Sequence, residues 1–508
     1  MTHATAATIE HSVAQRGLSV RAVTTALLGL FAFDNLLFLH FWGLPLSATV
    51  GLAFVATTAI WFLFRGISQD LPTISVRTAA VAFLISAALF ALGGEGRFFY
   101  ANTDWQIRDA VLRDMASNPW PYAYDVEGTA YFLRAPLGTY LLPAMFGEHA
   151  ELALLFFNSL RLTLLLTLGW HLFANTRERA IGLTVFLLFS GWDIVGTALF
   201  WVLKIPASWD HLERWNFNHQ FSSHITQAFW VPQHAIAGWT CAVAFLLWRK
   251  GVVPLGVFAA SVPLVAIWSP LAIMGAVPFA LFAGFVALRA RAWAWSDVAA
   301  AGLAVATALP ALLYLRIDAA ELGMHTLPFR AFVWLLGIGL EVLPFAFPLL
   351  WVRSPAIDRS TVLLTSLVLL PMPLMQIGNG ADFEMRASIM PLALLSIAFA
   401  QWICSIVDEK PARVGAAGYA IVAIALGAAT PLSELRRTLM NGPSPSPLCS
   451  LIGAYSQQDN SASYGVYLAR VSSLPRWLSN VPTVAGRDDP DRCWARRWVV
   501  PARAVQRR

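Results

Sequence analysis

The sequence predicts an all-α polytopic membrane protein with about thirteen transmembrane helices and amphipathic helices in large outer loops. Of its 508 residues, 57% are hydrophobic and only 13% are charged, whereas soluble proteins carry about 25% charged residues. The apolar residues also gather in runs of about 17–23 residues, each long enough to cross roughly 30 Å of hydrocarbon. These observations exclude a soluble enzyme, a nucleic-acid-binding protein and a disordered scaffold.

Basic residues orient the predicted spans. Seven short segments on one face each hold two Arg or Lys residues, whereas the turns at 44–46 and 269–270 on the other face hold none. The positive-inside rule therefore predicts a cytoplasmic N-terminus. Arginine far outnumbers lysine, which is typical of GC-rich bacterial coding, so we expect the bacterial inner membrane. The predicted spans are 22–42, 47–64, 78–94, 151–173, 181–200, 234–248, 252–267, 271–288, 297–315, 331–351, 361–377, 388–406 and 415–430.

Two parts of the chain are expected. Residues 1–430 form a multi-span catalytic domain with outer loops 95–150, 192–233 and 378–387, and residues 431–508 form an Arg- and Trp-containing tail, expected in the periplasm. The tail holds eleven Arg against five acids. Because the positive-inside rule disfavours such a tail outside, a cytoplasmic tail with one span fewer or more stays open. If the tail is outside, Cys449 and Cys493 could pair.

The first outer loop contains a predicted helix with a defined start. Thr103 and Gln106 match the capping box, which makes Asp104 the first helical residue. An apolar stripe and two i,i+4 charge pairs predict an amphipathic helix on the outer membrane surface. The stripe is Ile107, Val111 and Met115, and the pairs are Asp104/Arg108 and Asp109/Arg113.

Asp104 has two interpretations. An acid at a helix start interacts favourably with the helix dipole, worth about 0.3–1 kcal/mol. Alternatively, Asp104 is an ionised carboxylate beside Trp105 at the membrane–water boundary, where it would act as a base or a metal ligand.

The succession of motifs after Asp104 favours the second interpretation. A Trp–Pro break at 118–121 is followed by Tyr131–Phe132–Leu133–Arg134–Ala135–Pro136–Leu137 and Phe146–Gly147. Over residues 95–161 this resembles the first periplasmic loop of the GT-C membrane glycosyltransferases, notably aminoarabinose transferases and protein mannosyltransferases. The resemblance implies that Asp104 is catalytic and that Arg134 contacts the phosphate of a polyprenyl carrier. The family's first motif is usually an acidic pair, whereas Trp105 follows Asp104 here, which bears on metal binding more than on base catalysis.

The second outer loop offers a second acid. The resemblance implies that Asp193 is this acid, with Asp210 and Glu213 as rivals. Two carboxylates from separate loops could hold a divalent ion such as Mg or Mn, or one could deprotonate an acceptor. No metal is certain, and the histidine spacings indicate hydrogen bonding rather than zinc. Trp105, Trp230 and His234 are candidate contacts to sugar or acceptor.

Arginines near the membrane boundary are candidates for phosphate binding. Arg386 in the third loop either forms a structural ion pair with Asp382 or Glu384, or holds the carrier phosphate with its guanidinium fork. Asp382 is also a candidate acceptor contact. Arg161, close to the outer surface, could pair with Asp104, Asp109 or the phosphate, whereas Asp34 and Glu341 are expected to form interhelical hydrogen bonds.

These residues predict a glycosyltransferase that moves a sugar from a polyprenyl-phosphate carrier to a hydroxyl of a glycan, lipid or protein acceptor outside the membrane. The alternative is a transporter or flippase for a lipid-linked or polar solute. A non-catalytic subunit of an envelope assembly is a third possibility. Membrane lipid is an expected partner and nucleic acid is not.

Overall fold

The computed structural model of the protein describes residues 17–216, 219–319, 323–351, 358–378, 380–408, 414–457, 467–475, 482–485, 493–495 and 498. Most of these residues are helical, as predicted. Much of the predicted tail beyond residue 457 lies outside the described residues.

Among the described residues, eight helices are long and apolar enough to cross a membrane, and the bent pair α14 (Ala331–Glu341) and α15 (Leu343–Trp351) would make nine. The described chain thus supports a multi-pass membrane protein, but it does not confirm thirteen spans. Several predicted spans coincide with shorter apolar helices. The predicted span 252–267, for example, contains α11 (Leu255–Leu264), whose 10 residues rise only about 15 Å. The eight are Val20–Phe41, Leu46–Gly66, Gly147–Leu172, Thr176–Val202, Pro270–Ala290, Trp295–Leu315, Ile389–Val407 and Val414–Met440.

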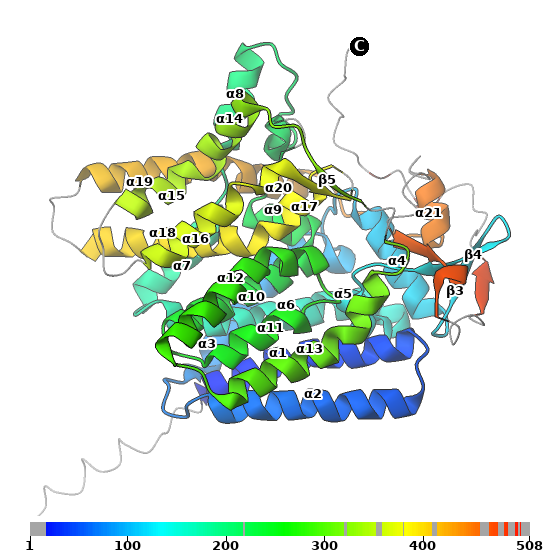
Figure 1. Ribbon diagram of the computed structural model, residues 1–508. Helices are drawn as coiled ribbons and strands as arrows, with labels where there is room; N and C mark the ends of the chain where they lie inside the picture. The colour runs from blue at the N-terminus through cyan, green and yellow to red at the C-terminus, as the bar shows by residue number, and fades with distance from the viewer. Residues whose placement is uncertain are drawn as a thin grey trace, which may run out of the picture.

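The long helices pack in two groups, each around its own hydrophobic core (Figure 1). The first group lies around α1 (Val20–Phe41), α2 (Leu46–Gly66), α3 (Val76–Leu92), α6 (Ala150–Gly169), α11 (Leu255–Leu264), α12 (Pro270–Ala290) and α13 (Trp295–Leu315). The second contains α7 (Thr176–Leu188), α15 (Leu343–Trp351), α16 (Arg359–Leu369), α18 (Ile389–Asp408) and α19 (Val414–Gly427). Helix α10 (Pro232–Arg249) joins the groups because it packs on both α6 and α18.

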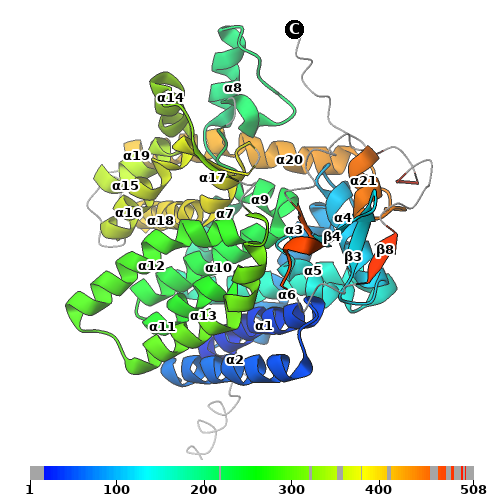
Figure 2. The same ribbon diagram turned by 45° about the vertical axis from the view of Figure 1, so that its right-hand side comes forward.

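Helices α8 (Asp193–Val202) and α14 (Ala331–Glu341) project from one side of the molecule (Figure 2). Their tips are apolar and exposed, for example Trp201 at 67% and Phe332 at 62%. Four shorter helices are α5 (Gly138–Ala144), α9 (His224–Trp230), α17 (Asp382–Ala387) and α20 (Ala429–Met440). Two small strand pairs are formed by β1 (Gly17–Leu18) with β2 (Ile74–Ser75) and by β5 (Met324–Thr326) with β6 (Met375–Ile377). The 3-10 turns are Glu95–Arg97, Gly147–His149, Trp170–Leu172, Leu212–Trp215, Met372–Leu374 and Val471–Ser473.

The first loop and the tail share one four-stranded sheet, in the order β7-β4-β3-β8. The hairpin β3 (Ala123–Val126) and β4 (Thr129–Leu133) is antiparallel, with Tyr124 opposite Tyr131. The tail supplies β7 (Leu468–Arg470), antiparallel to β4, and β8 (Thr483–Ala485), parallel to β3. Hydrogen-bonded strands cannot be separated by a bilayer, so the first loop and the tail lie on the same face of the membrane.

Further contacts join the tail to the first loop. Cys449 and Cys493 form a disulfide, the pairing that the sequence allowed for a tail on the outer side. The Asp114 carboxylate, from helix α4 (Trp105–Ser117), accepts hydrogen bonds from the Tyr124 hydroxyl at 2.8 Å and from the backbone N–H of Leu451 at 2.7 Å. Leu451 begins α21 (Leu451–Gln457). We call α4, α5, β3, β4, α21, β7 and β8 together the sheet domain.

Helix α4 differs from its prediction in two respects. It begins at Trp105, with Asp104 at the N-cap position, one residue later than the capping box predicts. Its polar side is also buried, because Gln106, Arg108 and Asp109 are each less than 10% exposed. The helix is therefore packed on all sides within the protein and does not lie on the membrane surface. Polar residues of neighbouring loops provide the partners that solvent or headgroups would have supplied.

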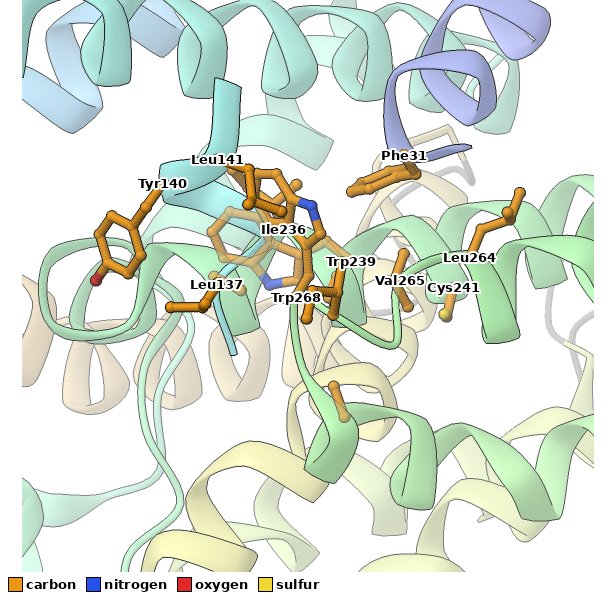
Figure 3. Close-up of a cluster of buried hydrophobic side chains, with 14 of the residues drawn as sticks. Phe31, Leu137, Tyr140, Leu141, Ile236, Trp239, Cys241, Leu264, Val265 and Trp268 are labelled. Carbon is orange, nitrogen blue, oxygen red and sulfur yellow. The ribbon is translucent and has the colours of Figure 1, made fainter. Parts of the chain in front are cut away.

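A buried aromatic cluster joins the sheet domain to the membrane helices (Figure 3). Trp268 is fully buried and meets Phe31 edge-on, with ring centroids 5.3 Å apart. The backbone of Gly138, the first residue of α5, lies against the Trp268 indole, where an added Cβ would come within 2.1 Å of a ring carbon. The Gly138 N–H also donates to the carbonyl of Ile267 at 2.9 Å. Glycine at 138 thus permits the close approach that positions α5.

Candidate functional site

Asp104 is held by its backbone and presents its carboxylate to solvent. The Asn102 side chain accepts a hydrogen bond from the Asp104 N–H at 3.0 Å, and its amide donates to the Phe229 carbonyl at 2.8 Å. The Trp105 indole donates to the same carbonyl at 2.9 Å. The end of α9 therefore anchors the start of α4, while Asp104 itself is exposed.

Arg386 reaches the same region from α17. Two glycines with positive φ, Gly378 and Gly380, turn the chain into this helix. Arg386 forms an ion pair with Asp382 one turn earlier, as one of the two predictions for it stated. The residue is 9% exposed, and its Nε is buried without a hydrogen-bond partner. Helix α17 packs closely on α12, because a Cβ on Gly275 would come within 1.9 Å of the Ala387 carbonyl oxygen.

Arg108 and His234 complete the inner wall of this region. The Arg108 guanidinium donates to the Gln233 amide oxygen at 2.7 Å. The neighbouring His234 hydrogen bonds with the Ser269 hydroxyl at 2.8 Å and lies within electrostatic range of Arg386 and Arg108. Tyr467, from the tail, lies within the same range of both arginines and of Asp104 and Asp382. We call Asp104, Arg108, Asp382, Arg386 and Tyr467 the outer cluster.

The charges of the outer cluster act on the Asp104 carboxylate. Water reaches this side chain, yet the surrounding protein displaces enough solvent to raise its pKa. The positive charges of Arg108 and Arg386 oppose this effect and lower the pKa, whereas Asp382 raises it. The net direction is upward, so Asp104 is a stronger base than its position at a helix start alone would make it.

A second charged group adjoins the outer cluster. Glu434 accepts two hydrogen bonds from Arg437, both at 2.9 Å, and one from the Trp230 indole at 2.9 Å. His211 approaches Glu434 at 3.3 Å and is also within electrostatic range of Asp104. Glu434 and Arg437 belong to α20, which the sequence analysis assigned to the tail. The opposite charges of Glu434 and Arg437, three residues apart, are the sequence signal by which this helix could have been predicted.

Two buried acids, Glu95 in the 3-10 turn after α3 and Asp109 in α4, have raised pKa values. Burial raises the pKa of Glu95 to about 8, against its hydrogen bond from the Asn158 amide at 2.9 Å. Burial likewise raises the pKa of Asp109 to about 7, although Arg97 lies 3.4 Å away. Arg97 also forms an ion pair with Glu151. Polar groups therefore gather at one end of α3 and α6, beside the outer cluster.

Asp193, the second predicted catalytic acid, is fully buried. Its carboxylate accepts hydrogen bonds from Ser190 at 2.8 Å and from Thr430 at 2.6 Å. The Glu341 carboxyl group lies within interaction range of the Asp193 carboxylate. The Trp215 indole donates to a carboxylate oxygen of Glu341 at 2.7 Å. The structure thus places Asp193 in an interhelical contact, the role that the sequence predicts for Glu341.

Arg161 lies inside the helix bundle. Its guanidinium donates to both oxygens of Asp34, at 2.7 and 2.9 Å, and lies over the Trp268 ring. Both members of the ion pair are buried. Arg161 therefore pairs with Asp34 and not with Asp104 or Asp109, and the interhelical bonding expected of Asp34 is present.

The remaining predicted site residues are placed as follows. Arg134 is 3% exposed, and its backbone N–H donates to the carbonyl of Tyr467 at 2.6 Å. Trp105 is 2% exposed, and its indole N–H donates to the Phe229 carbonyl. The structure thus brings Asp104, Asp382 and Arg386 together, with His234 and Arg134 nearby. It places Asp193 and Arg161 in contacts of their own.

Tyr467 was missed by sequence reasoning, because its position depends on tail strands that pair with a hairpin more than 300 residues earlier. Arg108 was assigned only to a charge pair along its own helix. Its bond to Gln233 depends on how α4 and α10 pack together, which no local pattern predicts.

Within the described part of the chain, no three His, Cys, Asp or Glu side chains gather in an arrangement that could hold a metal ion. The possibility of Mg or Mn therefore stays a prediction. No family model, no curated protein and no solved structure matches the chain.

Proposed function

We propose that the protein is a glycosyltransferase that moves a sugar from a polyprenyl-phosphate carrier to a hydroxyl acceptor at the outer face of the bacterial inner membrane. One observation carries the proposal: exposed Asp104 lies within electrostatic range of the guanidinium groups of Arg108 and Arg386. A base for the acceptor and cations for the phosphate therefore share one accessible region. The resemblance of residues 95–161 to GT-C enzymes supports the same reaction.

In the proposed reaction the acceptor oxygen attacks the anomeric carbon, and the bond from that carbon to the carrier phosphate breaks. The electron pair of the broken bond passes to the phosphate oxygen, and the acceptor's proton passes to Asp104. The raised pKa of Asp104 favours this transfer because it makes the carboxylate a better base. The arginines stabilise the negative charge that grows on the departing phosphate.

The other groups of the site take supporting roles. The Arg386 side chain forms an ion pair with Asp382 and is 11% exposed, so its guanidinium is the proposed cation for a phosphate oxygen. Trp230, His234 and Asp382 are the candidate contacts to the acceptor or sugar. Arg134 remains a proposed phosphate contact on the basis of the resemblance. The cytoplasmic N-terminus, the carrier, the acceptor classes and any divalent ion belong to this proposal.

The test is the transfer of radiolabel from polyprenyl-phosphate sugars to membrane lipid or glycan by the purified protein. Asp104→Asn removes the base and keeps the shape of the side chain, so we expect transfer to fall by about 10²–10⁴-fold, the usual contribution of a general base. Asp125→Asn is the matched control, because Asp125 is exposed in the β3–β4 hairpin and, among the described residues, its side chain accepts a hydrogen bond from the Gly128 N–H alone. Added or chelated Mg and Mn decide the metal requirement.

Equal transfer by the Asp104→Asn and Asp125→Asn proteins would remove Asp104 from catalysis. Failure of the folded wild-type protein to transfer any carrier-linked sugar would contradict the glycosyltransferase and favour the transporter or flippase.

A further inference from the structure

A cavity of about 310 Å³ lies between the two groups of membrane helices, and it is independent of the proposed function. Its walls come from α3, α6, α7, α10 and α18, and most of its lining is apolar, including Leu165, Leu183 and Val243. The cavity opens to the surface, because Val81 lines it and is 49% exposed. A volume of this size lies in the range of small-ligand sites.

The cavity lies toward the membrane face opposite the outer cluster. Helix α3 has 17 residues and a length of about 26 Å; it begins beside Arg77 and leads at its other end to Glu95 beside α4. The lining residues of α3 run from Arg77 to Ile85, a rise of about 12 Å. The cavity therefore reaches from one face toward the middle of a bilayer about 30 Å thick.

Two arginines stand at the mouth of this apolar cavity. Arg77 is exposed in the first turn of α3, and Arg179 lies in the first turn of α7. The Arg179 guanidinium lies 4.2 Å from the Trp170 ring and bonds only backbone carbonyls, those of Trp170 and Ala174. Among the described residues neither arginine forms an ion pair. The nearby Glu178 carboxylate accepts from the Ala174 N–H and the Asn175 amide instead.

We propose that this cavity binds one hydrocarbon chain of an anionic phospholipid, whose phosphate lies against Arg77 and Arg179. The apolar lining matches the chain, and the two arginines, which form no ion pair among the described residues, match the headgroup. Membrane lipid is the source, because the cavity opens at the level of the bilayer. The lipid then fills the space between the two helix groups on the face opposite the outer cluster.

The test uses the full-length protein, purified in detergent and exposed to phosphatidylglycerol or phosphatidylcholine, with bound lipid counted by native mass spectrometry. We expect wild type to retain one phosphatidylglycerol in preference to phosphatidylcholine. Ile85→Trp fills the cavity and should abolish retention. Leu84→Trp is the matched control, because Leu84 is adjacent, 67% exposed and outside the lining, so retention should persist.

The headgroup is tested separately by Arg77→Gln combined with Arg179→Gln. The double variant should lose the preference for phosphatidylglycerol by about tenfold, the effect of removing charge-assisted hydrogen bonds. Arg65→Gln, which also lies at the end of a helix, should leave the preference unchanged. Retention by Ile85→Trp that equals wild type, or wild type without preference between the two lipids, would overturn the proposal.

Discussion

Arg161 and Arg386 are both buried arginines that pair with an aspartate, and the two pairs differ in their access to solvent. The Arg161 and Asp34 side chains are 1% and 0% exposed, and the Arg161 guanidinium lies near the rings of Trp268 and Phe31. The Arg386 and Asp382 side chains are 11% and 25% exposed, close to exposed Asp104. Each arginine has a buried Nε without a hydrogen-bond partner. Access, and not the count of missing hydrogen bonds, therefore separates a structural ion pair from a ligand site.

The largest effect on stability is expected for the buried pair of Arg161 and Asp34. Arg161→Ala leaves the Asp34 carboxylate buried without its counter-charge, which costs about 3–5 kcal/mol. We expect little folded protein and a much lower melting temperature in a thermal unfolding measurement. Asp34→Asn combined with Arg161→Gln removes both charges and keeps an acceptor for Trp268, so it should recover most of the loss. A double variant as unstable as Arg161→Ala would contradict this role.

Substitutions in the partly exposed pair of Arg386 and Asp382 should affect sugar transfer more than stability. Arg386→Gln removes a cation that stabilises the departing phosphate, so transfer should fall by about 10²–10³-fold, as for the loss of one oxyanion donor. The melting temperature should stay near wild type, because Asp382 can be solvated. Arg386→Lys retains the charge without the fork, and it should recover part of the rate in the radiolabel assay. Full activity in Arg386→Gln would remove this arginine from the site.

The buried acids Glu95 and Asp109 should make stability depend on pH. Glu95 has a folded pKa of about 8 against its ordinary value of 4.5, so the folded state holds its proton more tightly. The stability that Glu95 contributes should be fully present below pH 4.5 and fall as pH rises toward 8, by a few kcal/mol at about 1.36 kcal/mol per pKa unit. Glu95→Gln cannot ionise and should flatten the decline in melting temperature between pH 5 and 8. A decline as steep as in wild type would show that another group causes it.

The smallest effect is expected for Asp382, the acidic partner of Arg386. Asp382→Asn removes a partly exposed i,i+4 ion pair, worth at most about 1 kcal/mol. We expect a melting temperature within a few degrees of wild type and a smaller loss of transfer than in Arg386→Gln. A loss of transfer as large as in Arg386→Gln would show that Asp382 has a direct part in the reaction.

The sequence predicted the helical membrane class and the helix after Asp104, and it offered the ion pair between Arg386 and Asp382 as one of two alternatives, because each depends on local pattern. It did not predict that Arg161 pairs with Asp34, since the two residues are 127 positions apart and only helix packing brings them together. The shared sheet of the first loop and the tail was missed for the same reason. Glu434 shows a different failure, because the tail's many arginines obscured an amphipathic helix.

The most direct test of the contrast between the two arginines is the binding of polyprenyl phosphate, without a sugar, to the purified protein. Titration by calorimetry would compare wild type, Arg386→Gln and the Asp34→Asn, Arg161→Gln double variant. We predict that Arg386→Gln weakens binding by at least about tenfold, the loss of one charge-assisted contact, while the folded double variant binds like wild type. Normal binding by Arg386→Gln together with weakened binding by the double variant would contradict the account.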